Sequence, residues 1–227
     1  MKTLKQKLGL TTTDILFYVL ALVLIAYSLI TLVFSRSMLA KFVEEDGTVE
    51  NITAIMLFAT SILSVVRAKQ FAGQKQHVWV FTQIVLAVFF FFAAGEEISW
   101  GQRIFHIQSG EFFLEHNAQG ETNLHNLVVG HTKINKLIFS QMLTVVLVLY
   151  FLFLEFLAKK VKWIGNLVRY FNVPLPKLHH TVMMLFSAVI IQGIYYPRHD
   201  ELLECVFAII FFLIFLHPKK WYTEKTA

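Results

Sequence analysis

The sequence predicts an all-α integral membrane protein with about six transmembrane helices. Of the 227 residues, 56% are hydrophobic and only 15% are charged, whereas soluble domains carry about 25% charged residues. Apolar stretches long enough to cross a hydrocarbon core about 30 Å thick recur along the chain. They lack the strict alternation of a membrane β-strand, and backbone groups in lipid must bond internally, so we expect helices.

We expect one membrane domain, residues 1–227, with a long outer loop at 95–136 that is partly helical or re-entrant. A cytoplasmic segment at 159–177 mixes basic residues with Trp163 and Tyr170 and is typical of an amphipathic stretch at the membrane surface. The expected spans are Asp14–Phe34, Val49–Val66, Val78–Ala94, Leu137–Leu157, His180–Tyr196 and Leu202–Leu216.

Basic residues predict the orientation of these spans. If the N-terminus is cytoplasmic, 14 of the 20 Lys and Arg fall in inner segments and six in outer ones. The positive-inside rule then places both termini in the cytoplasm, and we expect a multi-pass protein of the bacterial inner membrane. The net charge of +5 is explained by this topology and by anionic lipid, so no nucleic-acid partner is expected.

The acidic residues, which did not enter that assignment, gather on the opposite side. Twelve of the 15 Asp and Glu lie in outer segments or in the outermost turn of a span. A depletion of basic residues on the outer side would by itself leave acidic residues there. Against this explanation, several of the acidic residues lie at the edges of apolar spans. The single cysteine, Cys205, excludes an intrachain disulfide and a cysteine-rich metal site within one chain.

The start of the outer loop supplies the main catalytic candidates. Glu96 and Glu97 follow the third span directly, and an ionisable group at the membrane boundary is costly unless it is paired or faces a polar cavity. Either carboxylate is a candidate general base, and Arg103 is a candidate clamp for an anionic group. The alternative for Glu96 and Arg103 is an ion pair that fixes the fold.

A second polar group follows in the same loop, where Gln119, Glu121, Asn123, His125 and Asn126 fall within eight residues. We expect Gln119 and Asn123 to satisfy the loop backbone, and His125 to be either an acid or a metal ligand. If the outer ends of the helices converge, a divalent metal (Zn²⁺, or Ca²⁺ or Mg²⁺) could bind there. The candidate ligands are Glu50, Glu97, His125, His199 and Asp200.

Three motifs carry a resemblance: Glu-Asp-Gly-x-x-Glu at 45–50, Gly-Glu-Glu-Ile-Ser-Trp-Gly-Gln-Arg at 95–103 and Asn-x-Gln-Gly-Glu-x-Asn-Leu-His-Asn at 117–126. On these the chain resembles an uncharacterised group of bacterial multi-pass membrane proteins, which implies a shared membrane architecture and no particular activity. Its layout is also faintly similar to the alkaline ceramidase and progestin-receptor-like membrane hydrolases. Those have seven helices and a zinc held by three histidines, a spacing that this chain lacks.

Three functions are compatible with these patterns. The first is a membrane-embedded hydrolase or transferase, with or without a divalent metal, that acts on a lipid or lipid-linked substrate at the outer leaflet. The second is an oligomeric channel, transporter or ion-responsive sensor with an outer acidic vestibule. The third is a non-enzymatic subunit that binds another membrane protein. Membrane lipids are expected partners in each case, and a membrane-protein partner or a homo-oligomer in the last two.

Overall fold

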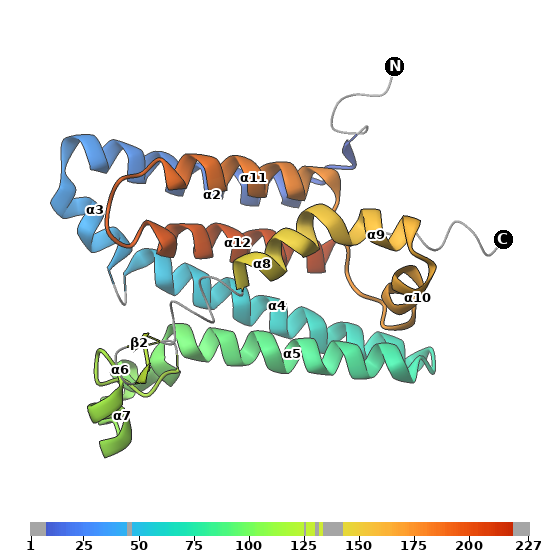
Figure 1. The fold of residues 1–227 in the computed structure, drawn as a ribbon, viewed down its shortest axis with the longest axis horizontal. Helices are drawn as coiled ribbons and strands as arrows, with labels where there is room; N and C mark the ends of the chain where they lie inside the picture. Colours follow the sequence, from blue (N-terminus) through green and yellow to red (C-terminus); the bar gives the residue numbers. More distant parts are fainter. Residues whose placement is uncertain (1–7, 45–46, 125, 130–131, 134–142, 220–227) are drawn as a thin grey trace.

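The computed structural model describes residues 8–44, 47–124, 126–129, 132–133 and 143–219 (Figure 1). Within these ranges the chain is almost entirely helical. The exception is a short antiparallel pair of strands, β1 (Val128–Val129) and β2 (Thr132–Lys133). The predicted all-α class is therefore confirmed, and the outer loop is partly helical.

Three helical stretches are long and apolar enough to cross a membrane: Thr12–Phe34, Arg36–Gly73 and His77–Glu97. They comprise α2 (Thr12–Phe34), α3 (Arg36–Val43), α4 (Thr48–Gly73) and α5 (His77–Glu97). Large apolar side chains cover their outer surfaces, among them Leu16, Phe81 and Val88 at 61–66% exposure. Apolar surface on this scale is unfavourable in water and is solvated by lipid, which supports membrane association.

The remaining expected spans are also helical but shorter or less regular. α8 (Leu143–Val148), the π-helical turn η3 (Leu149–Phe153) and α9 (Leu154–Lys160) follow one another, while residues 137–142 of the expected fourth span lie outside the described residues. α11 (Leu178–Gln192) ends before Tyr196, so the predicted end of the fifth span is wrong. The chain turns there at Gly193 to reach α12 (His199–Leu216).

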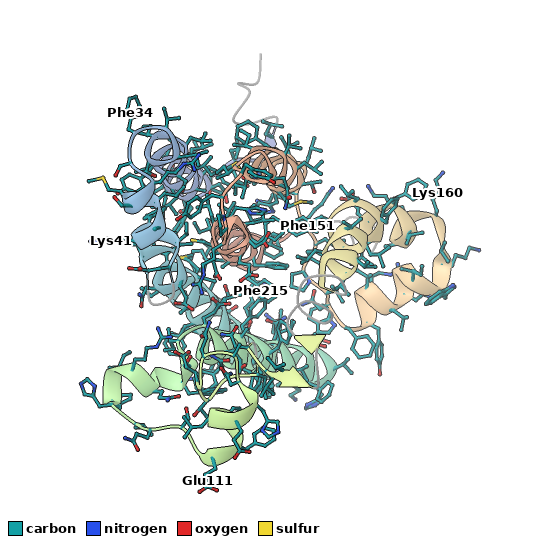
Figure 2. The ribbon with its side chains drawn as sticks, turned by 60° about the vertical axis from the view of Figure 1, so that its left-hand side comes forward. Phe34, Lys41, Glu111, Phe151, Lys160 and Phe215 are labelled. Carbon is teal, nitrogen blue, oxygen red and sulfur yellow. The ribbon has the colours of Figure 1, made fainter. Side chains whose placement is uncertain are left out.

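α12 forms the centre of the fold. It lies between α2 and α11 on one side and α4 and α5 on the other (Figure 1). Its fully buried side chains are Cys205, Val206, Ile209, Ile210, Leu213 and Ile214. Phe215 lies between α12 and α5 (Figure 2), where its ring packs edge-on against Phe90 with 5.0 Å between centroids. This deeply buried helix is thus enclosed by helices whose outer surfaces are themselves apolar.

The π-helical turn η3 brings one aromatic side chain against α12 and another against the chain near Pro174. Phe151 is 5% exposed and packs against Phe211, with 5.7 Å between ring centroids. The Tyr150 hydroxyl donates to the Pro174 carbonyl at 2.6 Å. A π turn holds one more residue than an α turn, which changes the side of the helix on which later residues lie.

The helices align so that the molecule has two distinct ends (Figure 1). At the first, called here the loop end, α5 ends and α12 begins. The short helices α6 (Gln102–Phe105) and α7 (Glu111–His116), which follow α5 in the chain, lie at the same end. At the second, the terminal end, α2 begins and α12 ends. His217 lies there 3.5 Å from the Asp14 carboxylate, between Nδ1 and Oδ1.

The expected amphipathic segment contains α10 (Lys162–Tyr170), at the terminal end. Trp163 and Tyr170 are exposed, whereas Gly165 and Val168 are buried. A Cβ on Gly165 would lie 2.4 Å from the Ala158 carbonyl oxygen, so only glycine permits the close packing of α10 on α9. Glu155 accepts from both Lys159, four residues later on the same helix, and Lys219, at 2.5 and 2.6 Å.

Candidate functional site

The end of α5 directs its two consecutive glutamates to different places. The helix stops at Glu97, and the chain then takes a left-handed conformation at Ser99, Trp100 and Gly101, with φ values of 47°, 55° and 73°. The indole of Trp100 folds back over Gly95, where a Cβ would meet the ring at 2.8 Å. The glycine therefore permits a tight reversal of the chain that separates Glu96 from Glu97.

Glu96 is bonded into the loop. Its Oε1 accepts from the Trp100 indole nitrogen at 2.8 Å, and its Oε2 accepts from the Leu124 backbone nitrogen at 2.5 Å. The residue is 7% exposed. A buried carboxylate that accepts two N–H groups fixes the chain that donates them. Glu96, one of the predicted bases, thus joins the end of α5 to the segment at 117–126.

A connected polar network holds the rest of this loop. Ser99 donates to Glu121 at 2.5 Å, and the Asn123 side chain donates to Ser99 at 2.8 Å. Arg103 forms an ion pair with the same Glu121. Asn117 donates to the carbonyl and the side-chain oxygen of Asn123, both at 2.9 Å. Asn123 therefore has the structural role expected for it, and Arg103 has an intraloop partner.

Glu97 turns the other way, toward α12. Its carboxylate meets those of Glu201 and Glu204 so that one oxygen from each lies within 4.8 Å of the others. We call these three residues the carboxylate cluster. Glu201 and Glu204 are three residues apart and so share one face of α12. All three side chains are partly buried, and a single cation of ordinary coordination radius fits between such oxygens.

Further acidic groups surround the cluster. Glu50, in the first turn of α4, interacts electrostatically with both Glu97 and Glu204, and Glu96 adds to the negative potential at Glu97. Neither Glu97 nor Glu204 has a hydrogen bond or an ion pair with any other residue that the structure describes. Carboxylates at this spacing repel one another strongly unless a proton or a cation lies between them.

Of the other predicted ligands, Glu50, His199 and Asp200 are not members of this cluster. His199 donates from Nδ1 to the Tyr196 carbonyl at 3.0 Å, and its Nε2 lies 3.3 Å from an Asp200 oxygen. The Asp200 side chain is 69% exposed. These two residues thus pair with each other at the start of α12. His125 lies outside the described residues.

Glu201 and Glu204 were not among the predicted metal ligands, although both had been placed on the outer side. Their spacing on one helix face was the signal that could have identified them. Glu204 lies one turn further into the expected sixth span than Glu201. A carboxylate so placed is more costly than the exposed Asp200 and is the stronger functional candidate.

The terminal end holds a second polar group of different composition. Asp14 is fully buried, and its Oδ2 accepts from the Thr11 backbone nitrogen and hydroxyl at 2.7 and 2.8 Å. His179 bonds the Tyr18 hydroxyl at 2.7 Å, and His180 accepts at Nδ1 from the Lys177 backbone nitrogen at 3.1 Å.

Lys177 adds a positive charge to this group. Burial lowers the pKa of its ammonium, while the Asp14 carboxylate acts in the opposite direction. Asp14 therefore has basic side chains around it, unlike the carboxylate cluster at the other end of α12.

Comparison with protein-family models, curated proteins and solved structures finds no match. The resemblance to bacterial multi-pass membrane proteins therefore stays a prediction from the three motifs. Any functional assignment depends on the geometry of the two ends.

Proposed function

We propose that this chain is a membrane-embedded, divalent-cation-dependent hydrolase or transferase that acts on a lipid or lipid-linked substrate at the outer leaflet. The carboxylate cluster of Glu97, Glu201 and Glu204 is the observation that supports this. The three side chains come from two helices that are far apart in the sequence. Holding them together costs free energy, which a bound cation offsets.

The chemistry of the cluster favours a hard cation. All three donors are carboxylate oxygens, the ligands that Mg²⁺, Ca²⁺ and Mn²⁺ prefer, whereas Zn²⁺ sites commonly include imidazole or thiolate. Among the described residues, His199 is bonded to Tyr196 and paired with Asp200. Of the two metal classes expected from the sequence, the structure thus supports the Mg²⁺ or Ca²⁺ class.

The position of the cluster supports a lipid substrate. Glu97 closes α5, and Phe91 and Phe92, one to two turns earlier on that helix, are 50% and 40% exposed. A lipid lying along these rings would bring its headgroup to the level of the carboxylates. A divalent cation there would bind an anionic or ester headgroup, and a carboxylate could accept the proton of an attacking water.

Cation binding is the first test. Purified protein in nanodiscs is titrated calorimetrically with MnCl₂, MgCl₂ and CaCl₂, beside the variants Glu97→Gln and Glu204→Gln. We expect one cation per chain and an affinity loss of at least about tenfold in either variant, because even outer-shell partners of metal ligands have effects of that size. Affinity should also fall at lower pH, because protons compete for the carboxylates.

Glu115→Gln is the matched control, since Glu115 is exposed and belongs to the same end of the molecule. It should bind cations as the parent does. Equal affinity in the parent, Glu97→Gln and Glu204→Gln would contradict the site.

Turnover is the second test. Nanodiscs made from a bacterial lipid extract are incubated with the protein and the tightest-binding cation, and new lipid products are followed by mass spectrometry. Products should form with the parent and not with Glu204→Gln or in excess EDTA. Cation binding without any product would contradict the enzyme and favour the ion-responsive sensor.

A further inference from the structure

A short segment after α5 exposes its large apolar side chains. Trp100, Ile104, Phe105 and Ile107, here called the loop apolar segment, are between 41% and 70% exposed. Ile104 and Phe105 end the short helix α6, and Phe105 lies against Gly101, where a Cβ would approach its ring at 3.0 Å. Four large apolar side chains exposed within eight residues are unusual for a loop that faces water.

Two polar side chains of the same segment, Gln102 and Arg103, bond within the loop, while His106 is exposed. Gln102 donates to the Ser109 hydroxyl at 2.7 Å and accepts from the Thr122 backbone nitrogen at 2.8 Å. Arg103 pairs with Glu121. The usual arrangement of a soluble loop is thus reversed, with hydrogen-bonding groups satisfied inside and apolar groups outside. Such an arrangement suits a medium that offers few hydrogen bonds.

The loop apolar segment continues the exposed surface of α5. The Trp100 ring packs against Phe92 and Phe91, with centroid distances of 5.4 and 6.1 Å. Both phenylalanines are exposed on a helix long and apolar enough to cross a membrane. Trp100 therefore continues the exposed apolar surface of α5 into the loop apolar segment.

From these observations we infer that the loop apolar segment lies in the lipid leaflet at the loop end, at the boundary between headgroups and acyl chains. Tryptophan and phenylalanine favour this boundary. Glu111, the first residue of α7, lies by contrast at the outer edge of the loop, away from Phe215 and the centre of the bundle (Figure 2). The segment would then hold the loop network, and with it the end of α5, at a fixed depth in the membrane.

Spin labelling can test this depth directly, because Cys205 is the chain's single cysteine and is fully buried. Nitroxide labels are placed at Ile104→Cys and Phe105→Cys in a Cys205→Ala background, with the protein in phosphatidylglycerol-containing nanodiscs. Power saturation compares collisions with oxygen, which partitions into lipid, and with a water-soluble nickel chelate. Val88→Cys on α5 gives the lipid reference, and Gln108→Cys and Glu111→Cys give loop references.

We expect the oxygen-to-nickel collision ratio at positions 104 and 105 to approach that at 88 and to exceed that at 108 and 111 severalfold. A ratio at 104 and 105 equal to that at 111 would place the segment in water and overturn the inference. Low collision rates with both reagents would show a covering protein and would also overturn it. If Cys205→Ala folds poorly, the parent background serves, because the buried thiol resists labelling.

Discussion

The two ends of α12 differ in the charges that surround their buried carboxylates. Glu204 and His217 are separated by about 20 Å along this helix, at 1.5 Å per residue. At the loop end, Glu97, Glu201 and Glu204 bring like charges within 4.8 Å of one another. At the terminal end, Asp14 lies beside His217, accepts two bonds from Thr11 and is balanced by Lys177.

This difference separates a structural cluster from a candidate binding site. A carboxylate surrounded by basic groups and N–H donors has compensation within the protein, and it ties the start of α2 to the end of α12. Glu97 and Glu204 have no hydrogen bond or ion pair to another residue that the structure describes, so their facing carboxylates gain from an external cation or proton. The following variants test whether this contrast is real.

The largest effect is expected from cation-dependent stabilisation at the loop end. A cation at about 100 times its dissociation constant adds about 2.7 kcal/mol to the stability of the form that binds it. For a chain of this size that raises Tm by about 5–10 °C. Glu97→Gln should reduce the rise by about half or more and, in EDTA, should melt no lower than the parent, because it removes like-charge repulsion. Scanning fluorimetry with and without MnCl₂ measures both.

Glu96→Ala should have the next largest effect, and of a different kind. It leaves the Trp100 indole and the Leu124 amide without the acceptor that each has in Glu96, at a cost of about 1–3 kcal/mol. We expect faster amide hydrogen exchange at 117–124 with cation affinity retained. If Glu96→Ala weakened cation binding as much as Glu97→Gln does, the division of roles between these neighbours would be wrong.

A smaller effect is expected from Thr11→Ala at the terminal end. It removes the cap of α2 that holds Asp14, and loss of such a cap costs about 1 kcal/mol. Tm should fall by about 2–4 °C, equally with and without MnCl₂. Thr11→Ser keeps the hydroxyl and should restore the parent Tm. A decrease that MnCl₂ reverses would show that the two ends are not independent.

The smallest effect is expected from Asp200→Asn, which changes a ligand suggested by the sequence. Its side chain is 69% exposed and pairs with His199. Exposed pairs contribute about 0–1 kcal/mol, so we expect the calorimetric cation affinity to change by about twofold at most. A loss as large as that in Glu204→Gln would make Asp200 a ligand and shift the site toward the surface.

The membrane class was predictable because composition and apolar length decide it, and the three long apolar helices agree with that prediction. The roles of Glu96 and Glu97 were not predictable from their positions. A continuing helix would have placed Glu96, Trp100 and Arg103 on one face. The chain instead takes positive φ at Ser99 and Trp100, residue types that seldom do so, and Arg103 pairs with Glu121.

The carboxylate cluster illustrates a second limit. The spacing of Glu201 and Glu204 can be read from the sequence, since it follows from helical geometry. Their meeting with Glu97 depends on how α5 and α12 lie in the bundle, a long-range arrangement that no local pattern encodes. The pairing of Glu155 with Lys159 was predictable, because the two residues are four apart on one helix. The second partner, Lys219, was not, because that contact depends on how distant parts of the chain pack together.

The π-helical turn η3 contains one more residue than an α-helical turn, and this determines the direction in which the side chains of α9 point. If the same residues formed ordinary α-helix instead of a π turn, α9 would be rotated by about 100° relative to α8. Glu155 would then turn away from Lys219, and the end of α12 would lose its tie to α9. The extra residue of this turn thus aligns α9 with the chain that follows α12, although the two segments are far apart in the sequence.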